Sequence, residues 1–121
     1  MLIGELAEIT GCSRDTIRFY EKKGLIHELY KRDEQNNYKI YNKQTVDRIM
    51  LIQQGKTFGF TLKEIQKLIE DLEKGLVSAE YMLEVCENKL NTVKQKVIDL
   101  NTIKKQLEEK IKILSLGECK A

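Results

Sequence analysis

Apolar side chains recur at helical spacing in two short runs at the start of the chain. The first run covers residues 2–9, and Gly11 ends it. Ser13 is a suitable N-cap for a second helix over residues 14–23, which Gly24 closes. Two short helices joined by a tight turn predict a helix-turn-helix.

The pattern then changes to short runs that favour strands. Residues 30–32 and 38–41 are rich in Tyr, Lys and Ile, and a polar stretch separates them. Asn tolerates the positive φ angles that hairpin turns require, so Asn36-Asn37 is the predicted turn. The pattern predicts a small β-hairpin, which would form a wing beside the two helices.

Two further helices follow the predicted hairpin. Asn42 is a candidate N-cap for the third helix. Thr61 and Glu64 have the spacing of a capping box at the start of the fourth, which Gly75 ends. The apolar stripe that we expect on the third helix consists of Val46, Ile49, Met50 and Gln53.

After Gly75 the apolar positions repeat every seven residues. Spacings of three and four alternate over five heptads from residue 76 to residue 114, with Lys104 as the single polar member. No other face of the chain is long enough to cover such a rod, so the pattern predicts self-association and leaves the direction of the paired helices open. The residues expected at the dimer contact are Leu83, Cys86, Leu90, Val93, Val97, Leu100, Leu107, Ile111 and Leu114.

Composition fits a small globular head with one extension. The chain has 121 residues, of which 41% are hydrophobic and 33% charged. No apolar run approaches the ~20 residues that span a bilayer, and the N-terminus lacks a secretory signal, so we expect a cytoplasmic protein without a membrane partner. The predicted class is mainly α: a winged helix-turn-helix head (residues 1–75), a long dimerising coiled-coil helix (76–114) and a short tail (115–121). Because the rod takes up the rest of the chain, no appended ligand-binding domain is expected.

The distribution of charge says more than the net charge of +2. All four arginines, Arg14, Arg18, Arg32 and Arg48, lie in the first half, and the second half contains only lysines as cations. The guanidinium fork suits phosphates and guanine edges, whereas lysine solvates a helix surface. The two halves therefore have different tasks.

The first half has the residue types of a DNA-binding head. Arg14 and Arg18 stand beside Ser13 and Thr16 on one predicted helix, and a hairpin rich in Tyr and Lys follows. A helix fits the major groove, and a wing can grip the adjacent backbone. From periodicity alone, a solvated helix pair of any small helical protein remains the alternative.

Three blocks of sequence resemble the MerR family of transcriptional regulators, in the family's order. Residues 3–26 (IGELAEITGCSRDTIRFYEKKGLI) resemble its opening segment, and residues 36–41 (NNYKIY) its wing, where an Asn-Gly-Tyr-Arg string is usual. Residues 56–65 (KTFGFTLKEI) are similar to its second wing and fourth helix. The wing departs from the pattern at Asn37, where Gly is usual, and at Lys39, where Arg is usual.

The resemblance implies a homodimer held by an antiparallel coiled coil. Such dimers bind pseudo-palindromic promoter DNA, then bend and untwist it, so that an overlong spacer shortens and RNA polymerase engages. The positions that match the family's DNA contacts are Ser13, Arg14, Thr16 and Arg18 on the recognition helix, Tyr20, Tyr38 and Lys39 at the backbone, and Lys56 from the second wing.

The cysteines do not predict a metal site or a cofactor. Cys12, Cys86 and Cys119 are far apart, and His27 is the single histidine. Metal-sensing members of the family resemble one another in a cysteine near the start of the long helix and a cysteine-bearing loop after it, and no cysteine stands at those positions here. Cys12 is interpreted as a small packing residue, with a redox switch as the alternative. Whether a small-molecule effector exists is left open.

Other classes of function compete with a transcription regulator. One is a coiled-coil interaction protein whose head binds protein, and another is an architectural or excisionase-like DNA-binding protein without transcriptional output. An enzyme is not expected, because the chain has no nucleophile–base pair at a recognised spacing and no Gly-rich phosphate loop. The sequence leaves open the operator, the regulated genes and the direction of regulation.

Overall fold

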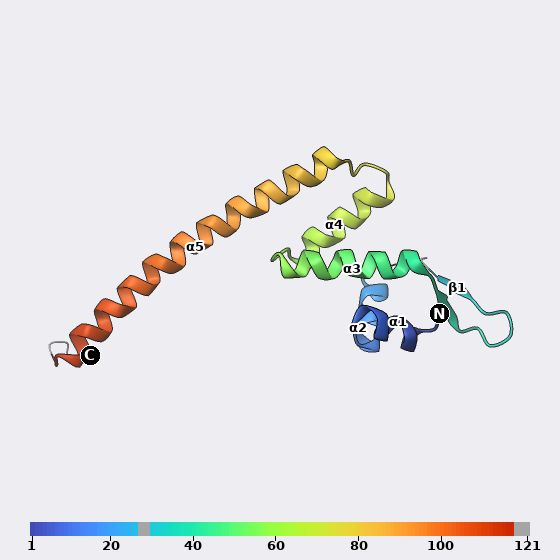
Figure 1. The fold of residues 1–121 in the computed structure, drawn as a ribbon, viewed down its shortest axis with the longest axis horizontal. Coiled ribbons are helices and arrows are strands. Elements are labelled where there is room, and N and C mark those ends of the chain that lie inside the picture. Colours follow the sequence, from blue (N-terminus) through green and yellow to red (C-terminus); the bar gives the residue numbers. More distant parts are fainter. Residues whose placement is uncertain (27–29, 118–121) are drawn as a thin grey trace. The chain divides into compact units, whose positions relative to one another are not determined.

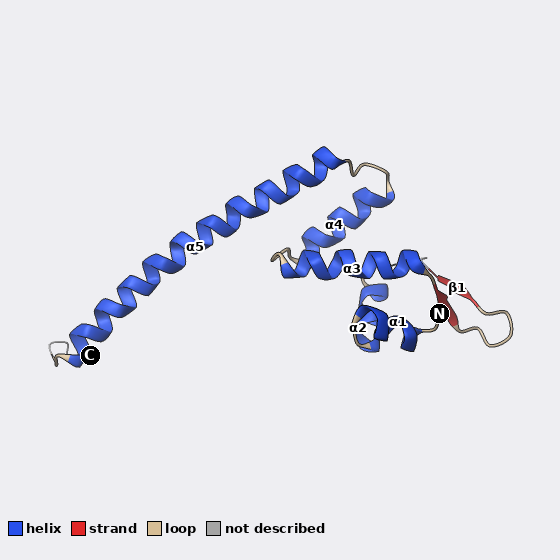
Figure 2. Ribbon diagram, in the orientation of Figure 1, coloured by secondary structure: helices blue, strands red, loops and turns tan. Residues whose placement is uncertain are grey.

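The protein is described by a computed structural model that covers residues 1–26 and 30–117 (Figure 1). It is mainly helical, with one small hairpin between the second and third helices (Figure 2), which confirms the predicted class. The elements in chain order are α1 (Ile3–Thr10), α2 (Arg14–Lys22), β1 (Tyr30–Arg32), β2 (Lys39–Tyr41), α3 (Lys43–Thr57), α4 (Leu62–Glu73) and α5 (Ala79–Ser115).

The chain divides into two compact units. The first is Met1–Val77, and the second begins at Ser78. The domain boundary predicted after residue 75 lies two residues before this division. None of the described helices is long and apolar enough to cross a membrane.

The turn between α1 and α2 forms as the sequence predicts. Gly11 adopts a φ of 74°, and its N–H donates to the carbonyl of Ala7. The hydroxyl of Ser13 accepts a hydrogen bond from the N–H of Thr16 at 3.0 Å and so caps α2. A left-handed residue followed by a capped helix gives the sharp change of direction of a helix-turn-helix.

The hairpin is short and is held along both edges of β2. Strands β1 and β2 are antiparallel, with Tyr30 opposite Tyr41. Asn37 has a φ of 59°, as expected for an asparagine in the hairpin turn. On the other side of β2, the N–H of Tyr41 donates to the carbonyl of Met1 at 2.7 Å, and the amino terminus donates back to the carbonyl of Tyr41 at 2.8 Å.

The predicted capping box at Thr61 is present, and the predicted N-cap Asn42 also forms one with Thr45, but the buried face of α3 differs from the expected stripe. Thr45, Ile49 and Ile52 are buried at spacings of four and three residues, whereas Met50 is 49% exposed. The prediction that Met50 faces the core is therefore wrong. The reason is that Thr45 is polar but occupies a core position. A stripe that is chosen from apolar residues therefore begins one residue later, at Val46.

Each helix of the first unit and strand β2 contribute one or two side chains to its core, and the segment after α2 adds two more. Gly55 of α3 lies where α4 crosses, and an added Cβ there would stand 3.3 Å from Ile65. The missing side chain allows a close approach of these helices. The buried hydrophobic residues are Leu6, Ile17, Tyr20, Leu25, Ile26, Tyr41, Ile49, Ile52, Ile65 and Ile69.

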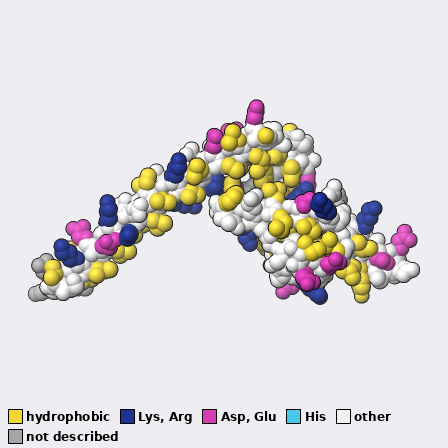
Figure 3. Space-filling model, viewed as in Figure 1, with side chains coloured by type: hydrophobic (Ala, Val, Ile, Leu, Met, Phe, Trp, Pro, Cys, Tyr) yellow, Lys and Arg dark blue, Asp and Glu magenta, His cyan; other side chains and the backbone are white. Residues whose placement is uncertain are grey.

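The second unit is one long helix. Helix α5 has 37 residues and begins at Ala79, because the hydroxyl of Ser78 accepts from the N–H of Tyr81 at 3.1 Å. The rod therefore starts three residues later than the predicted residue 76, and Leu76 precedes it. None of the α5 residues, all of which the structure describes, is buried. Figure 3 shows hydrophobic side chains along its length.

The apolar seam of α5 continues past its polar member. The side chain of Lys104 is exposed, and its Nζ lies 3.9 Å from a carboxylate oxygen of Glu108 on the next turn. Ile103, which the heptad pattern did not include, is 49% exposed beside it. The spacing from Leu100 through Ile103 to Leu107 keeps a helical stripe, so Lys104 does not interrupt the apolar face.

Candidate DNA interface

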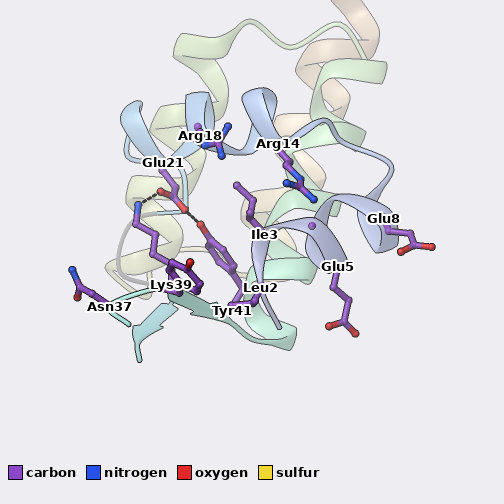
Figure 4. A pocket seen from close by; sticks show the side chains of 12 residues that line it. Leu2, Ile3, Glu5, Glu8, Arg14, Arg18, Glu21, Asn37, Lys39 and Tyr41 are labelled. Carbon is purple, nitrogen blue, oxygen red and sulfur yellow. Dashed lines mark hydrogen bonds and ion pairs between the residues drawn. The ribbon is translucent and has the colours of Figure 1, made fainter. Parts of the chain in front are cut away.

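Helix α2 has one face in the core and one free face. Ile17 and Tyr20 are buried at 0% and 2% exposure. Arg14 and Arg18 stand at i and i+4 on the exposed outer face, and Glu21, one turn further on, is only 12% exposed beside the wing. This outer face, α1 and the wing line an open groove of about 1010 Å³ (Figure 4).

The groove brings together side chains from three elements and the wing turn. Its cations and carboxylates are equal in number, with Arg14, Arg18 and Lys39 on one side of the count and Glu5, Glu8 and Glu21 on the other. The residues that line it are Leu2, Ile3, Gly4, Glu5, Glu8, Arg14, Arg18, Glu21, Asn37, Tyr38, Lys39 and Tyr41. Four of the eight predicted DNA contacts, Arg14, Arg18, Tyr38 and Lys39, are in this set.

The guanidinium of Arg14 lies against the first turn of α1. A Cβ added to Gly4 would stand 2.7 Å from its Nη2 atom. The absence of a side chain at Gly4 therefore leaves room for the arginine to rest over the helix. Arg14 is exposed, so this guanidinium is available to a ligand in the groove.

The guanidinium of Arg18 makes only a surface ion pair among the described residues. Its Nη1 lies 3.3 Å from a carboxylate oxygen of Asp15, and both side chains are exposed. An exposed pair of this kind contributes little free energy. Arg18 can therefore exchange Asp15 for a phosphate or a base edge at small cost.

Ser13 and Thr16 do not line the groove. The Ser13 hydroxyl donates to the Thr16 hydroxyl at 2.8 Å and accepts from the Thr16 N–H. Both therefore serve first to cap α2. They stay candidate contacts because they lie at the end of α2 that a recognition helix presents to base edges.

Tyr20 does not have the position expected of a contact to the DNA backbone. Its ring packs in the core at 2% exposure, because it shares the inner face of α2 with Ile17. Lys56, at the end of α3, is exposed, and its Nζ lies 5.9 Å from the Tyr20 ring centroid. Tyr20 thus supports Lys56, which stays a candidate contact beside α2.

The wing offers two exposed groups and one lysine that is already paired. Tyr38 is 59% exposed. The Lys39 ammonium is bound to the carboxylate of Glu21. Arg32, which the site prediction left out, is exposed and donates from Nη1 to the carbonyl of Asn37 at 3.1 Å. The sequence did contain a signal for Arg32, because it is an arginine at the end of a run that favours a strand.

Arg48 is structural, which corrects the inference that all the arginines suit a nucleic-acid task. Its Nη1 donates to the carbonyl of Leu25 and to a carboxylate oxygen of Glu73, both at 3.1 Å. Its side chain is only 12% exposed. Arg48 therefore ties the segment after α2 to the end of α4.

Tyr41 has a pKa well above its usual value. Burial raises the pKa of its hydroxyl, and the hydrogen bond and negative charge of Glu21 raise it further. Because the neutral phenol donates to a carboxylate, ionisation would place two negative charges side by side. Tyr41 therefore remains a hydrogen-bond donor at every physiological pH.

The described cysteines have separate surroundings. Cys12 is half-buried in the turn before α2, and the Gln53 side-chain amide donates to its sulfur at 2.8 Å. Cys86 is exposed on α5. Within residues 1–26 and 30–117, no group of three His, Cys, Asp or Glu side chains is placed to hold a metal ion. Cys119 and His27 lie outside the described residues.

The chain matches two sequence families. One, described as MerR HTH family regulatory protein, matches residues 1–72, and the other, described as MerR, DNA binding, matches residues 46–110. A mercuric resistance operon regulatory protein from Bacillus cereus is 36% identical over 105 residues, which cover 87% of this chain and 78% of that protein. The regulator CueR from Vibrio cholerae is 30% identical over 109 residues, 90% of this chain and 77% of that protein.

Solved structures resemble the fold over most of its length. The MerR family regulator HiNmlR, which lacks the sensor domain and is bound to promoter DNA, is 31% identical, with a TM-score of 0.63, and the match covers 96% of this chain and 94% of HiNmlR. PbrR691 from Ralstonia metallidurans, in complex with lead(II), is 25% identical, with a TM-score of 0.75, and the match covers 90% of this chain and 84% of PbrR691. The family match covers residues 1–72, and these residues form a winged helix-turn-helix. The chain therefore belongs to the MerR family of regulatory proteins.

Proposed function

We propose that the chain is a sequence-specific transcription regulator that binds promoter DNA as a homodimer. Helix α2 enters the major groove with Arg14 and Arg18, and the wing contacts the adjacent backbone. The observation that carries the proposal is the groove between α2 and the wing, with two arginines on its helical side. The promoter-bound relative HiNmlR supports it.

The dimer rests on the seam of α5. Nine predicted seam residues repeat at heptad spacing, and the large ones among them are 39% to 64% exposed in the single chain. A helix of 37 residues, about 55 Å long, that exposes such a stripe is stabilised by pairing with a second copy. Pairing would present two heads to neighbouring turns of one duplex.

The mode of regulation follows from the family. A dimer that bends and untwists a promoter shortens the distance between its two recognition elements, and RNA polymerase then engages. The role is therefore binding and deformation of DNA in the cytoplasm, without a catalysed reaction. Binding of a metal is not part of the proposal, because within residues 1–26 and 30–117 neither Cys12 nor Cys86 belongs to a group of three side chains that could hold a metal ion.

Selection of a duplex from a random-sequence pool by the full chain tests the proposal. We expect a palindromic site whose affinity falls steeply with salt, because neutralised phosphates release counterions. Transcription in vitro from a promoter with that site in a long spacer separates a regulator from an architectural DNA-binding protein. A head that enriches no sequence, and binds protein instead, would contradict the proposal.

A further inference from the structure

A carboxylate of the recognition helix holds the wing strand. Glu21, in the last turn of α2, accepts a hydrogen bond from the Tyr41 hydroxyl through Oε1 and pairs with the Lys39 ammonium through Oε2. Figure 4 shows both contacts, which join α2 to β2. The partners are 18 and 20 residues away in the sequence, so the contact is tertiary.

The carboxylate and the phenol of this contact are largely removed from water, and the Lys39 side chain is 32% exposed. The Glu21 side chain is 12% exposed, and Tyr41 is 3% exposed. A carboxylate that loses water is stable only when both of its oxygens find donors. Here each oxygen has one, so removal of either partner would leave a poorly solvated charge.

The Lys39 ammonium is committed on a second side as well. It lies 4.8 Å from the centroid of the Tyr30 ring, and that ring packs on Tyr41 at 5.9 Å between centroids. A cation between a carboxylate and an aromatic face is held by both. Transfer of Lys39 to a phosphate would break two contacts and leave Glu21 facing DNA.

The wing needs such a support. Its strands have three residues each, and a two-stranded hairpin of this length is not stable alone. Its direction is therefore set at its base, where Met1 pairs with one edge of β2 and Glu21 holds the side chains of Lys39 and Tyr41.

We propose that Glu21 is a positioning residue of the DNA interface, and that Lys39 remains its counter-ion in the DNA complex instead of neutralising a phosphate. The wing contacts to DNA then fall to Tyr38 and Arg32, which are exposed. This inference rests on the proposed DNA binding. It reassigns Lys39 from a direct contact to a support of the wing.

The test compares Lys39→Met, Glu21→Gln and the double variant of the full chain. Lys31→Met, an exposed lysine on β1, is the matched control. Fluorescence anisotropy measures their affinity, at a series of salt concentrations, for the duplex that the wild-type chain selects. Tyr41→Phe is added because it removes one donor and no charge, and circular dichroism verifies that each variant is folded.

Lys39→Met and Glu21→Gln should each bind roughly ten-fold more weakly. The double variant should bind no more weakly than the worse of these two, because all three break the same contact. Lys39→Met should keep the wild-type slope of log K against log salt, and Tyr41→Phe should also lose affinity.

Three results together would overturn the inference and leave the proposed function standing. The slope would be reduced by about 0.9 per protomer in Lys39→Met, the losses of the two single variants would add in the double variant, and Tyr41→Phe would bind as the wild type does. Failure of the wild-type chain to select any duplex would overturn both.

Discussion

At the scale of single residues, the partners of a guanidinium decide its task. Arg48 is held by a backbone carbonyl and Glu73 in a half-buried position, so it is not available to DNA. Within the described part of the chain, Arg18 pairs only with the exposed carboxylate of Asp15, and Arg14 rests over Gly4. Two arginines on the free face of α2 therefore carry the recognition that we propose.

Arg18→Ala should weaken binding to the selected duplex by about 1–3 kcal/mol, because a charged contact to a base edge or phosphate is lost. Titration by fluorescence anisotropy measures this loss. Lys105→Ala, an exposed lysine on the outer face of α5, is the control and should bind as the wild type does. An affinity unchanged by Arg18→Ala would remove Arg18 from the interface.

Tyr41 makes the stability of the head depend on alkaline pH. Its pKa is raised in the folded state, so the unfolded chain loses the phenolic proton first, above pH about 10. The contribution of this group is complete below that pH and is lost as the pH rises through the folded pKa. Urea unfolding at pH 9 to 11 should show a fall in the free energy of unfolding. The fall should be smaller in Tyr41→Phe, and an equal fall would contradict the assignment.

At the scale of elements, the turn between α1 and α2 depends on one backbone conformation. Gly11 has a φ of 74°, and nothing lies within 4 Å of an added Cβ. Space is therefore available for a side chain there, and the left-handed backbone alone sets the cost of a substitution.

Gly11→Ala should lower the free energy of unfolding by about 1–2 kcal/mol, the cost of an L-residue in the left-handed region. Gly11→Asn is the matched variant and should lose less, because asparagine adopts this conformation more readily. Urea denaturation followed by circular dichroism gives both values. Equal losses would show that the side chain, and not the backbone angle, is responsible.

Elements with local signals were predictable from sequence, and contacts between elements were not. Ser13, Asn42 and Thr61 mark helix starts because a cap acts within three residues. The burial of Tyr20 and the pairing of Lys39 with Glu21 depend on how α2 packs on α3 and β2, which no short pattern contains. The resemblance to the family supplied the candidate contacts, and which of them touch DNA stays a prediction.

At the scale of the whole molecule, the apolar face of α5 is the feature that calls for a second chain. Leu100, near its middle, is 63% exposed, and Leu107 is 57% exposed. A continuous stripe of such residues is stable in water only when another helix covers it. The proposed dimer follows from this exposure.

Leu100→Asp should weaken self-association by roughly 2–5 kcal/mol for each copy, because a buried leucine is lost at the seam. Thr102→Asp is the control, since it adds the same charge on the outer face of α5. Sedimentation equilibrium over a range of concentrations compares the two. Equal dimerisation of both variants would place the contact elsewhere on the chain.

Sedimentation of the wild-type chain, alone and with the duplex that it selects, tests the central claim most directly. We expect two chains in the free particle at micromolar concentration and two chains on each duplex. A monomer in both samples, or a single chain on each duplex, would contradict it.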